Sequence, residues 1–304
     1  MSWAAHELES YFIQKHTKAR VSYLAILLGC LLPDLVTKLP VYGVHIGSFS
    51  FKASVPAEYH RGWPGVGPTH SLFFGVLVAV LFLYATGSRA WFLGVLLGQW
   101  AHVLTDTFDS VGTMVFFPFT TQHYTTGMWA YAAQQGRYGD AAAYYSSLGG
   151  AWDLLWLCLA LTGYKVFSRK FFFTTVVPND PAVWGWLKRR FALSPTAMVA
   201  LYRSYFIYGG ARIFAWFIWA RTIDKAPLDL SWGGPYWVHK YTHRPTPVLQ
   251  FLTNTVVGAV GFSLMLYVGW LLIGRRLWRR AEARERPTEA RERPAGTSGG
   301  AAGG

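Results

Sequence analysis

Apolar runs and polar segments alternate along most of the 304-residue chain. Several runs approach the length of about 17–25 residues that a transmembrane helix needs. Their bounds are 21–39, 71–86, 90–108, 151–167, 197–220 and 248–274. This pattern predicts an all-α fold, a polytopic membrane helical bundle with about five to six transmembrane helices.

The first 38 residues predict a helical hairpin. Residues 2–16 place Trp3, Leu8, Tyr11 and Phe12 at helical spacing, and the segment KHTKAR (15–20) makes a turn before the run at 21–39. Pro33 and Asp34 interrupt that run, which makes it the weakest of the six.

Composition supports a membrane protein. Hydrophobic residues make up 52% of the chain and charged residues only 14%, whereas a soluble domain carries about 25% charged residues. The net charge of +13 lies in short clusters beside the apolar runs and forms no continuous stripe, so we expect no nucleic-acid partner. Cys30 and Cys158 each lie inside an apolar run, which favours neither a disulfide framework nor a thiolate zinc site.

The distribution of basic residues predicts an orientation. With six spans, 18 of the 28 Lys and Arg residues fall on one side of the membrane together with both termini. Because cytoplasmic loops are enriched in Lys and Arg, we expect a multi-pass protein with both termini in the cytoplasm. Arg203 and Arg212 lie within the run 197–220, where we expect them to pair with carbonyl groups or with Asp153.

One apolar run ends in GQWAHVLTDTFDS (98–110), and its ionisable residues need an explanation. Ionisable groups in an apolar helix are expensive unless they are paired, bound to a metal or open to water. His102 and Asp106 are four residues apart and share one helix face, with Asp109 close to it. Such a pair offers two metal ligands from one rigid element; the alternative is an internal His–Asp packing pair.

More histidines and aspartates occur at the same membrane level. Asp34 and His70 lie at the corresponding ends of two other runs, and His60 precedes His70 by ten residues. Folding the hairpin back near residue 18 places His6 within about one helical turn of Asp34, at about 1.5 Å per residue. We therefore expect one metal-binding cluster, with the ligands His6, Asp34, His60, His70, His102 and Asp106.

The composition of this cluster indicates the kind of metal. Six nitrogen and oxygen ligands exceed what one tetrahedral zinc uses, so a pair of ions about 3.5–4 Å apart would use the full set. We expect a divalent metal, one or two ions, with zinc first and manganese or iron as alternatives.

Four motifs occur in a familiar order. LLPD (31–34) is followed by HRG (60–62) with THS (69–71), then GQWAHVLTD (98–106), then SVGTMVFFPF (110–119). In these motifs, and in the early His6, the chain resembles the YdjM-like family of inner-membrane proteins, for which metal-dependent hydrolysis has been inferred. The resemblance covers about residues 1–120. A more distant likeness is to zinc-dependent phospholipase C enzymes, which also use H-x-x-x-D in a helical metal site.

The chain departs from the family pattern at two places. Val36 stands where the family motif L-P-D-x-D has its second aspartate. The insertion WPGVGP (63–68) separates HRG from THS, so His60 and His70 cannot occupy successive turns of one helix.

The resemblance implies a location and an activity. It implies the bacterial inner (cytoplasmic) membrane and a membrane-embedded, metal-dependent hydrolase that acts on a lipid or lipid-linked (phospho)ester. Asp109 or Glu58 could serve as general base, because each is an unassigned carboxylate near the cluster. Thr69, Ser71 and Thr105 could orient the ligands.

Two other functions stay open at this point. The chain could be a non-catalytic membrane subunit that keeps a structural metal site, with the aromatic segment 221–247 docking a membrane-protein partner. It could also bind a haem between His70 and His102.

The motifs divide the chain into three parts. We expect residues 1–120 to form a metal-site membrane helical domain and residues 121–280 to add membrane helices with outer loops. Residues 281–304 contain EARERP twice and end in AGTSGGAAGG, which predicts a disordered charged tail with an added linker at its end.

Overall fold

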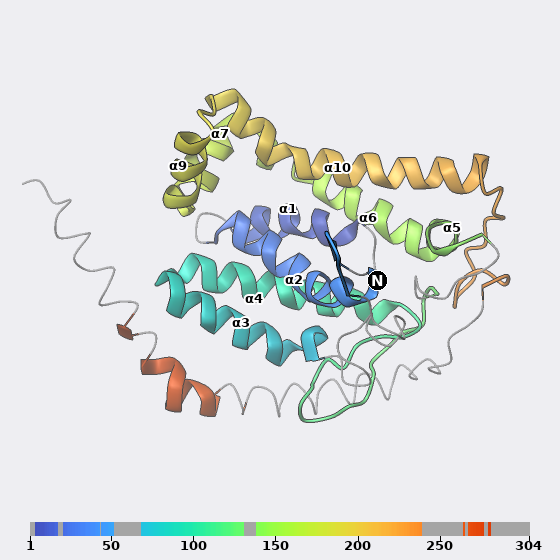
Figure 1. The fold of residues 1–304 in the computed structure, drawn as a ribbon, viewed down its shortest axis with the longest axis horizontal. Helices are drawn as coiled ribbons and strands as arrows, with labels where there is room; N and C mark the ends of the chain where they lie inside the picture. The colour runs from blue at the N-terminus through green and yellow to red at the C-terminus, as the bar shows by residue number, and fades with distance from the viewer. Residues whose placement is uncertain are drawn as a thin grey trace, which may run out of the picture.

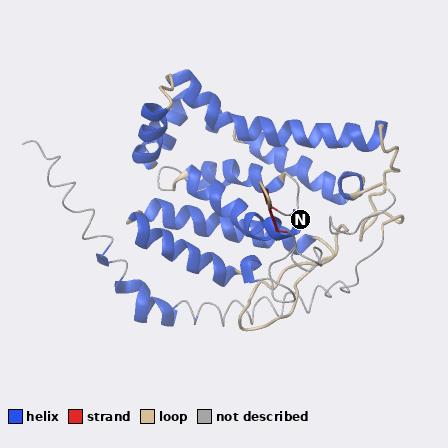
Figure 2. Ribbon diagram, in the orientation of Figure 1, coloured by secondary structure: helices blue, strands red, loops and turns tan. Residues whose placement is uncertain are grey.

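The protein, studied as a computed structural model, is mostly helical (Figure 1, Figure 2). The structure describes residues 4–17, 21–42, 44–51, 68–130, 138–238, 264, 267–276 and 279–280. The longer helices are α1 (Ala5–Thr17), α2 (Tyr23–Tyr42), α3 (Leu72–Thr86), α4 (Arg89–Thr105), α6 (Leu148–Thr162), α9 (Pro181–Arg190) and α10 (Pro195–Thr222). The shorter ones are η3 (Pro68–His70), η4 (Asp106–Phe108), α5 (Asp140–Tyr145), η5 (Tyr164–Phe167), α7 (Arg169–Phe171), η6 (Phe172–Val176), α8 (Val177–Asn179) and η7 (Trp270–Gly274).

A small β-hairpin, which the apolar pattern does not predict, follows α2. Strands β1 (Val44–Ile46) and β2 (Phe49–Phe51) pair antiparallel, with Val44 opposite Phe51. Gly47 has a φ of 59° in the turn between them, a conformation that glycine adopts without a steric penalty.

Helix α1 lies in the middle of the molecule (Figure 1) and packs against α2, α4, α6 and α10. It therefore joins the α2–α4–α3 group on one side to α6 and α10 on the other. The polar side chains of His6, Glu7, Glu9 and Gln14 are buried in α1 along with its apolar ones. Burial of a polar group is unfavourable unless a partner satisfies it, so these side chains point to specific interactions inside the bundle.

A buried carboxylate of α6 anchors the start of α1. The two oxygens of Asp153 accept hydrogen bonds from the backbone N–H groups of Ala4 (3.0 Å) and Ala5 (3.1 Å). The hydroxyl groups of Tyr144 and Tyr145 donate to the same carboxylate, at 3.1 and 3.0 Å. The carboxylate thus satisfies backbone donors that a helix leaves unpaired at its N-terminus.

The two arginines within the fifth apolar run have partners inside the fold. Arg203 Nε donates to the carbonyl oxygen of Phe167 at 2.7 Å, as the sequence predicts. Arg212 forms an ion pair with Glu7 of α1 at 2.8 Å, a partner that the sequence did not predict. These contacts tie α10 to the rest of the bundle.

Glycines let α2 and α4 approach closely. A Cβ atom on Gly98 would collide with the carbonyl oxygen of Ile26, and one on Gly29 would collide with the carbonyl oxygen of Val95. The two backbones are therefore almost in contact over one turn. This crossing brings the carbonyl group of Cys30 against the side chain of His102, one turn after Gly98.

The segment after α4 folds back beside the end of that helix. Asp109 Oδ1 accepts the N–H groups of Val111 (3.0 Å) and Gly112 (2.8 Å) and so closes a tight turn. Two isolated β-bridges then pair this segment with the residues that follow it: Thr113 pairs with Tyr124, and Asp109 pairs with Trp129.

The prediction of five to six transmembrane helices is wrong for the part of the chain that is described. There, no helix combines the length and the apolar character needed to cross a membrane. Helices α3 and α6 have 15 residues and α4 has 17, while a span takes about 20. Helix α10 has 28 residues, but Arg203, Arg212 and Arg221 lower its apolar character. The multi-pass topology with both termini in the cytoplasm depended on those spans and loses its support for the same reason.

Candidate metal centre

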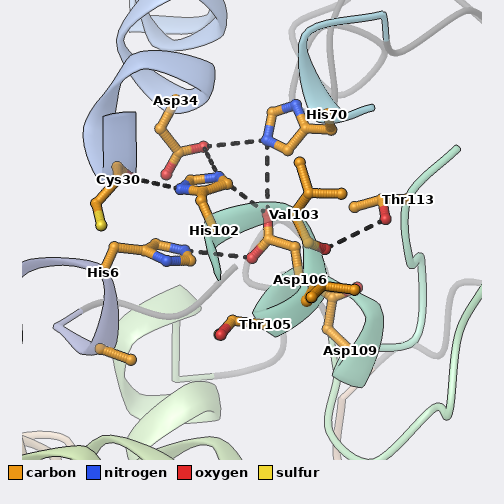
Figure 3. A network of polar contacts seen from close by, with 12 residues as sticks. His6, Cys30, Asp34, His70, His102, Val103, Thr105, Asp106, Asp109 and Thr113 are labelled. Atoms are coloured by element: carbon orange, nitrogen blue, oxygen red, sulfur yellow. Dashed lines mark hydrogen bonds and ion pairs between the residues drawn. The ribbon is translucent and has the colours of Figure 1, made fainter. Parts of the chain in front are cut away.

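Four side chains from separate elements converge at one end of α4 (Figure 3). Asp34 comes from α2, His70 from η3, His102 from α4 and Asp106 from η4. One ligand atom of each lies within 4.8 Å of the ligand atoms of the other three, and the group could hold a metal ion. His70, His102 and Asp106 are fully buried, whereas the side chain of Asp34 is 18% exposed.

The spacing of these atoms suits a shared ion better than direct hydrogen bonds. His70 Nε2 lies 3.6 Å from Asp34 Oδ1 and 3.5 Å from Asp106 Oδ2. His102 Nε2 lies 3.4 Å from Asp106 Oδ2 and 4.0 Å from Asp34 Oδ1. Charge-assisted hydrogen bonds are shorter, about 2.7–2.9 Å. Ligands of a tetrahedral zinc, at about 2.0–2.2 Å from the ion, lie about 3.3–3.6 Å from one another. The residues therefore fit a divalent ion at their centre.

The backbone of α2 fixes the tautomer of His102. Its Nδ1 donates to the carbonyl oxygen of Cys30 at 2.6 Å, and a carbonyl can only accept. The Nε2 lone pair therefore faces the two aspartates, where a ligand must present it. Burial holds the pKa of His102 well below its usual value, and the neighbouring His6 acts in the same direction. The imidazole is thus neutral at pH 7, the form that binds metals.

His70 is held by its own turn and by α4. Thr69 Oγ1 lies 3.1 Å from His70 Nδ1, and donation from that nitrogen leaves the Nε2 lone pair facing the aspartates. Gln99 Nε2 in turn donates to the carbonyl oxygen of Thr69 at 2.7 Å. The side chain three residues before His102 thereby fixes the turn that carries the second histidine.

His6 of α1 lies at the edge of the same cluster. Its Nε2 is 3.3 Å from Asp106 Oδ1, and its ring stacks on that of His102 with 3.8 Å between centroids. Helix α1 packs against both α2 and α4, and His6 reaches the cluster through Asp106 and His102.

Glu9 is a site residue that the sequence reasoning did not find. Its Oε2 lies 3.4 Å from His6 Nδ1, and its Oε1 accepts a hydrogen bond from the hydroxyl group of Thr105. The residue is fully buried. The available signal was the i, i+3 spacing of His6 and Glu9, which places both on one helix face.

The two predicted general bases have different outcomes. Asp109 is buried, and its Oδ1 accepts the two backbone N–H groups that close the turn after α4. In Figure 3 it lies on the far side of Asp106 from the histidines. Glu58 lies outside the described residues, as does the predicted ligand His60.

The cysteines contribute no thiol ligand to the described cluster. Burial raises the pKa of the Cys30 thiol well above its usual value, so this side chain stays protonated. Cys30 serves the site through its carbonyl oxygen. Cys158 is free and exposed on α6.

Comparison with known proteins places the chain in a family. The family model of the YdjM inner membrane protein matches residues 3–213, about two thirds of the sequence. The chain belongs to the YdjM inner membrane protein family. The YdjM match contains the whole described cluster and continues beyond the motifs that end near residue 120, into α10. No curated protein and no solved structure matches the chain.

Proposed function

We propose that the protein is a metal-dependent hydrolase that acts on a lipid or lipid-linked phosphoester. The observation that carries the proposal is the convergence of Asp34, His70, His102 and Asp106 at the spacing of ligands around one ion. The donor set contains only imidazole and carboxylate groups, which suits zinc first and manganese or iron as alternatives. Membership in a family of inner membrane proteins supports a substrate from the membrane.

Each residue has a separate part in this function. His102, oriented by the Cys30 carbonyl, and His70, next to Thr69, would hold the ion with neutral nitrogens. Asp106 and Asp34 would supply the negative charge that balances it. When bound, a divalent ion polarises the phosphoryl group and promotes the ionisation of water at neutral pH. Asp34 is the most exposed ligand, so the substrate would approach from its side.

The experiment is a hydrolysis assay on the purified full-length protein. The substrates are a chromogenic phosphodiester and phospholipid vesicles, assayed with added zinc or manganese and again after chelation. We expect metal-dependent turnover that His102→Ala reduces by at least about 100-fold, because loss of a mere supporting partner already costs about 10–100-fold. His16→Ala is the matched control, since His16 is exposed on α1 away from the buried cluster. Stoichiometric metal without turnover of any phosphoester would contradict the hydrolase.

One observation favours a second candidate function, a non-catalytic subunit with a structural metal site. His70, His102 and Asp106 are fully buried, and structural sites are closed whereas catalytic sites keep an open position. In this case a membrane-protein partner would copurify at fixed stoichiometry. The assay above separates the two, because both functions require the metal and only one requires turnover.

A haem between His70 and His102 is not part of the proposal. Both Nε2 atoms lie within 3.5 Å of the same carboxylate oxygen, Asp106 Oδ2. A haem held by two axial histidines would need its ring between the two Nε2 atoms, where the Asp106 carboxylate lies.

A further inference from the structure

We propose that a second divalent cation of the zinc class binds beside the first, between His6 Nε2 and Asp106 Oδ1. Asp106 would then bridge the two ions. This inference rests on the proposed metal centre, because the first ion is the one held by Asp34, His70, His102 and Asp106 Oδ2.

The two oxygens of Asp106 face different histidines (Figure 3). Oδ2 lies 3.5 Å from His70 Nε2 and 3.4 Å from His102 Nε2, while Oδ1 lies 3.3 Å from His6 Nε2. The contact to His6 is again longer than the roughly 2.7–2.9 Å of a charge-assisted hydrogen bond. Asp106 thus presents one oxygen to His6 and the other to His70 and His102. A carboxylate placed in this way can bridge two ions.

The stacking of His6 on His102 separates their lone pairs. The ring centroids are 3.8 Å apart, and the ring planes differ by only 19°. An imidazole lone pair lies in the plane of its ring, and both Nε2 atoms face oxygens of Asp106, so the two lone pairs run side by side in separate planes. They cannot meet at one ion about 2.0–2.1 Å from each nitrogen. The ring separation instead matches the roughly 3.5–4 Å between the ions of two-metal sites.

His6 has the surroundings of a metal ligand. Its Nδ1 faces the buried carboxylate of Glu9 at 3.4 Å, and Thr105 donates to the other oxygen of that carboxylate. Carboxylate–histidine pairs of this kind fix the tautomer so that Nε2 presents its lone pair. The residue is 3% exposed, and its Nε2 makes no hydrogen bond. Asp153 anchors the first turn of α1, which keeps His6 in place.

We expect the two metal positions to bind their ions with different affinities. The first ion has four protein ligands among the described residues, and the second has His6 and the bridging Asp106. Fewer protein ligands and a shared carboxylate mean weaker binding. We therefore expect metal binding in two steps, a tight one followed by a weaker one.

Metal titration of the full-length protein tests the inference. The protein is stripped with a chelator and titrated with Zn²⁺, and the bound metal is counted by elemental analysis. We expect two ions per chain in the wild type and in His16→Ala, and one tightly bound ion in His6→Ala. One ion per chain in both the wild type and His6→Ala would overturn the second site and leave the proposed function standing. No bound ion in the wild type would overturn both.

A spectroscopic measurement on the wild type avoids dependence on a variant that folds poorly. Two Mn²⁺ ions bridged by Asp106 would be spin-coupled, and the electron paramagnetic resonance spectrum of the fully loaded protein would show that coupling. Uncoupled Mn²⁺ signals at full loading would overturn the proposal. In His6→Ala we expect the coupled signal to disappear and the signal of a single ion to remain.

Discussion

Asp106 contacts three histidines at once, His6 through one carboxylate oxygen and His70 and His102 through the other. It is the carboxylate that lies between the histidines of α1, η3 and α4. It is fully buried, so its negative charge acts in a medium where charge interactions are strong. We therefore expect metal binding by the cluster to depend strongly on this carboxylate.

Asp106→Asn tests this dependence with little change in shape. The amide keeps the volume but removes the charge and one acceptor oxygen. We expect metal affinity to fall by more than about 100-fold, because the loss of a supporting partner alone costs about 10–100-fold. Metal content after dialysis measures it, with circular dichroism to show that the helices remain. Unchanged metal content in a folded variant would contradict the assignment.

Thr69→Val tests the support of His70. The substitution keeps the size of a buried side chain and removes the hydroxyl group 3.1 Å from His70 Nδ1. We expect metal affinity to fall by about 10–100-fold. A competitive chelator titration measures the change; equal affinity in Thr69→Val and wild type would show that the backbone alone orients His70.

Asp180 is a buried carboxylate away from the metal centre and gives a pH dependence. Burial raises its pKa to about 6, although hydrogen bonds from Ser22 and Trp91 act in the opposite direction. Because this value exceeds the unfolded value of about 4, the folded state binds the proton more tightly. The associated stability is present below about pH 4 and is lost as the pH rises to about 6.

The comparison of wild type with Asp180→Asn isolates this effect. Between pH 4 and 6, we expect the free energy of unfolding of the wild type to fall by up to about 3 kcal/mol relative to the variant. Denaturant titrations at several pH values measure it. A difference between the two proteins that stays constant with pH would contradict the raised pKa.

At the scale of elements, the crossing of α2 and α4 positions half of the cluster. Asp34 and the Cys30 carbonyl come from α2, and His102 comes from α4. Their approach depends on Gly29 and Gly98, which have no Cβ to separate the backbones. The geometry of the site is therefore a consequence of how closely two helices pack.

Gly98→Ala should move these helices apart. The new Cβ would collide with a backbone oxygen of α2, which cannot rotate away as a side chain would. We expect a loss of about 1–3 kcal/mol in stability, together with weaker metal binding. Thermal unfolding and chelator titration measure the two effects. Gly185→Ala on α9 is the control, since the nearest contact of its Cβ is a flexible arginine side chain.

The sequence predicted the positions of several helices, but it wrongly predicted that they cross a membrane. The runs at 71–86, 90–108 and 197–220 correspond to α3, α4 and α10, because apolar residues continue along most of each helix. Helix length was harder to predict: the turn at Gly87 and Ser88 ends α3 after 15 residues, and α4 ends after 17, at the short end of the range for a span. Apolar content therefore indicated membrane crossing where the described structure has short packed helices.

The cluster itself was predictable in part. His102 and Asp106 are four residues apart in one helical segment, and local geometry alone places them together. Glu9 and the Cys30 carbonyl were not predictable as partners, because they depend on the packing of α1 and α2 against α4. His60 and Glu58 stay predictions, since they lie outside the described residues.

At the scale of the whole molecule, the second half of the chain holds the first helix in place. Asp153 of α6 binds the start of α1, and Glu7 of α1 pairs with Arg212 of α10. These contacts cross residue 120, where the metal-site domain was expected to end. The division into domains stays a prediction, but the position of His6 depends on residues from both sides of it.

Asp153→Ala tests this long-range support. The substitution leaves two backbone N–H groups and two tyrosine hydroxyl groups without their acceptor. Each buried group left unsatisfied costs about 1–3 kcal/mol, so we expect a loss of several kcal/mol in stability. Thermal unfolding measures it. A change of less than about 0.5 kcal/mol, as at an ordinary surface position, would contradict the anchoring role.

The central claim is that the buried histidines and aspartates hold a divalent ion. X-ray absorption at the metal edge of the zinc-loaded wild-type protein tests it most directly, because it reports the atoms bound to the ion. We predict a shell of nitrogen and oxygen donors at about 2.0–2.2 Å that contains imidazole and no sulfur, and that is absent in His102→Ala. Sulfur donors at about 2.3 Å, or a wild-type protein that retains no metal, would contradict the claim.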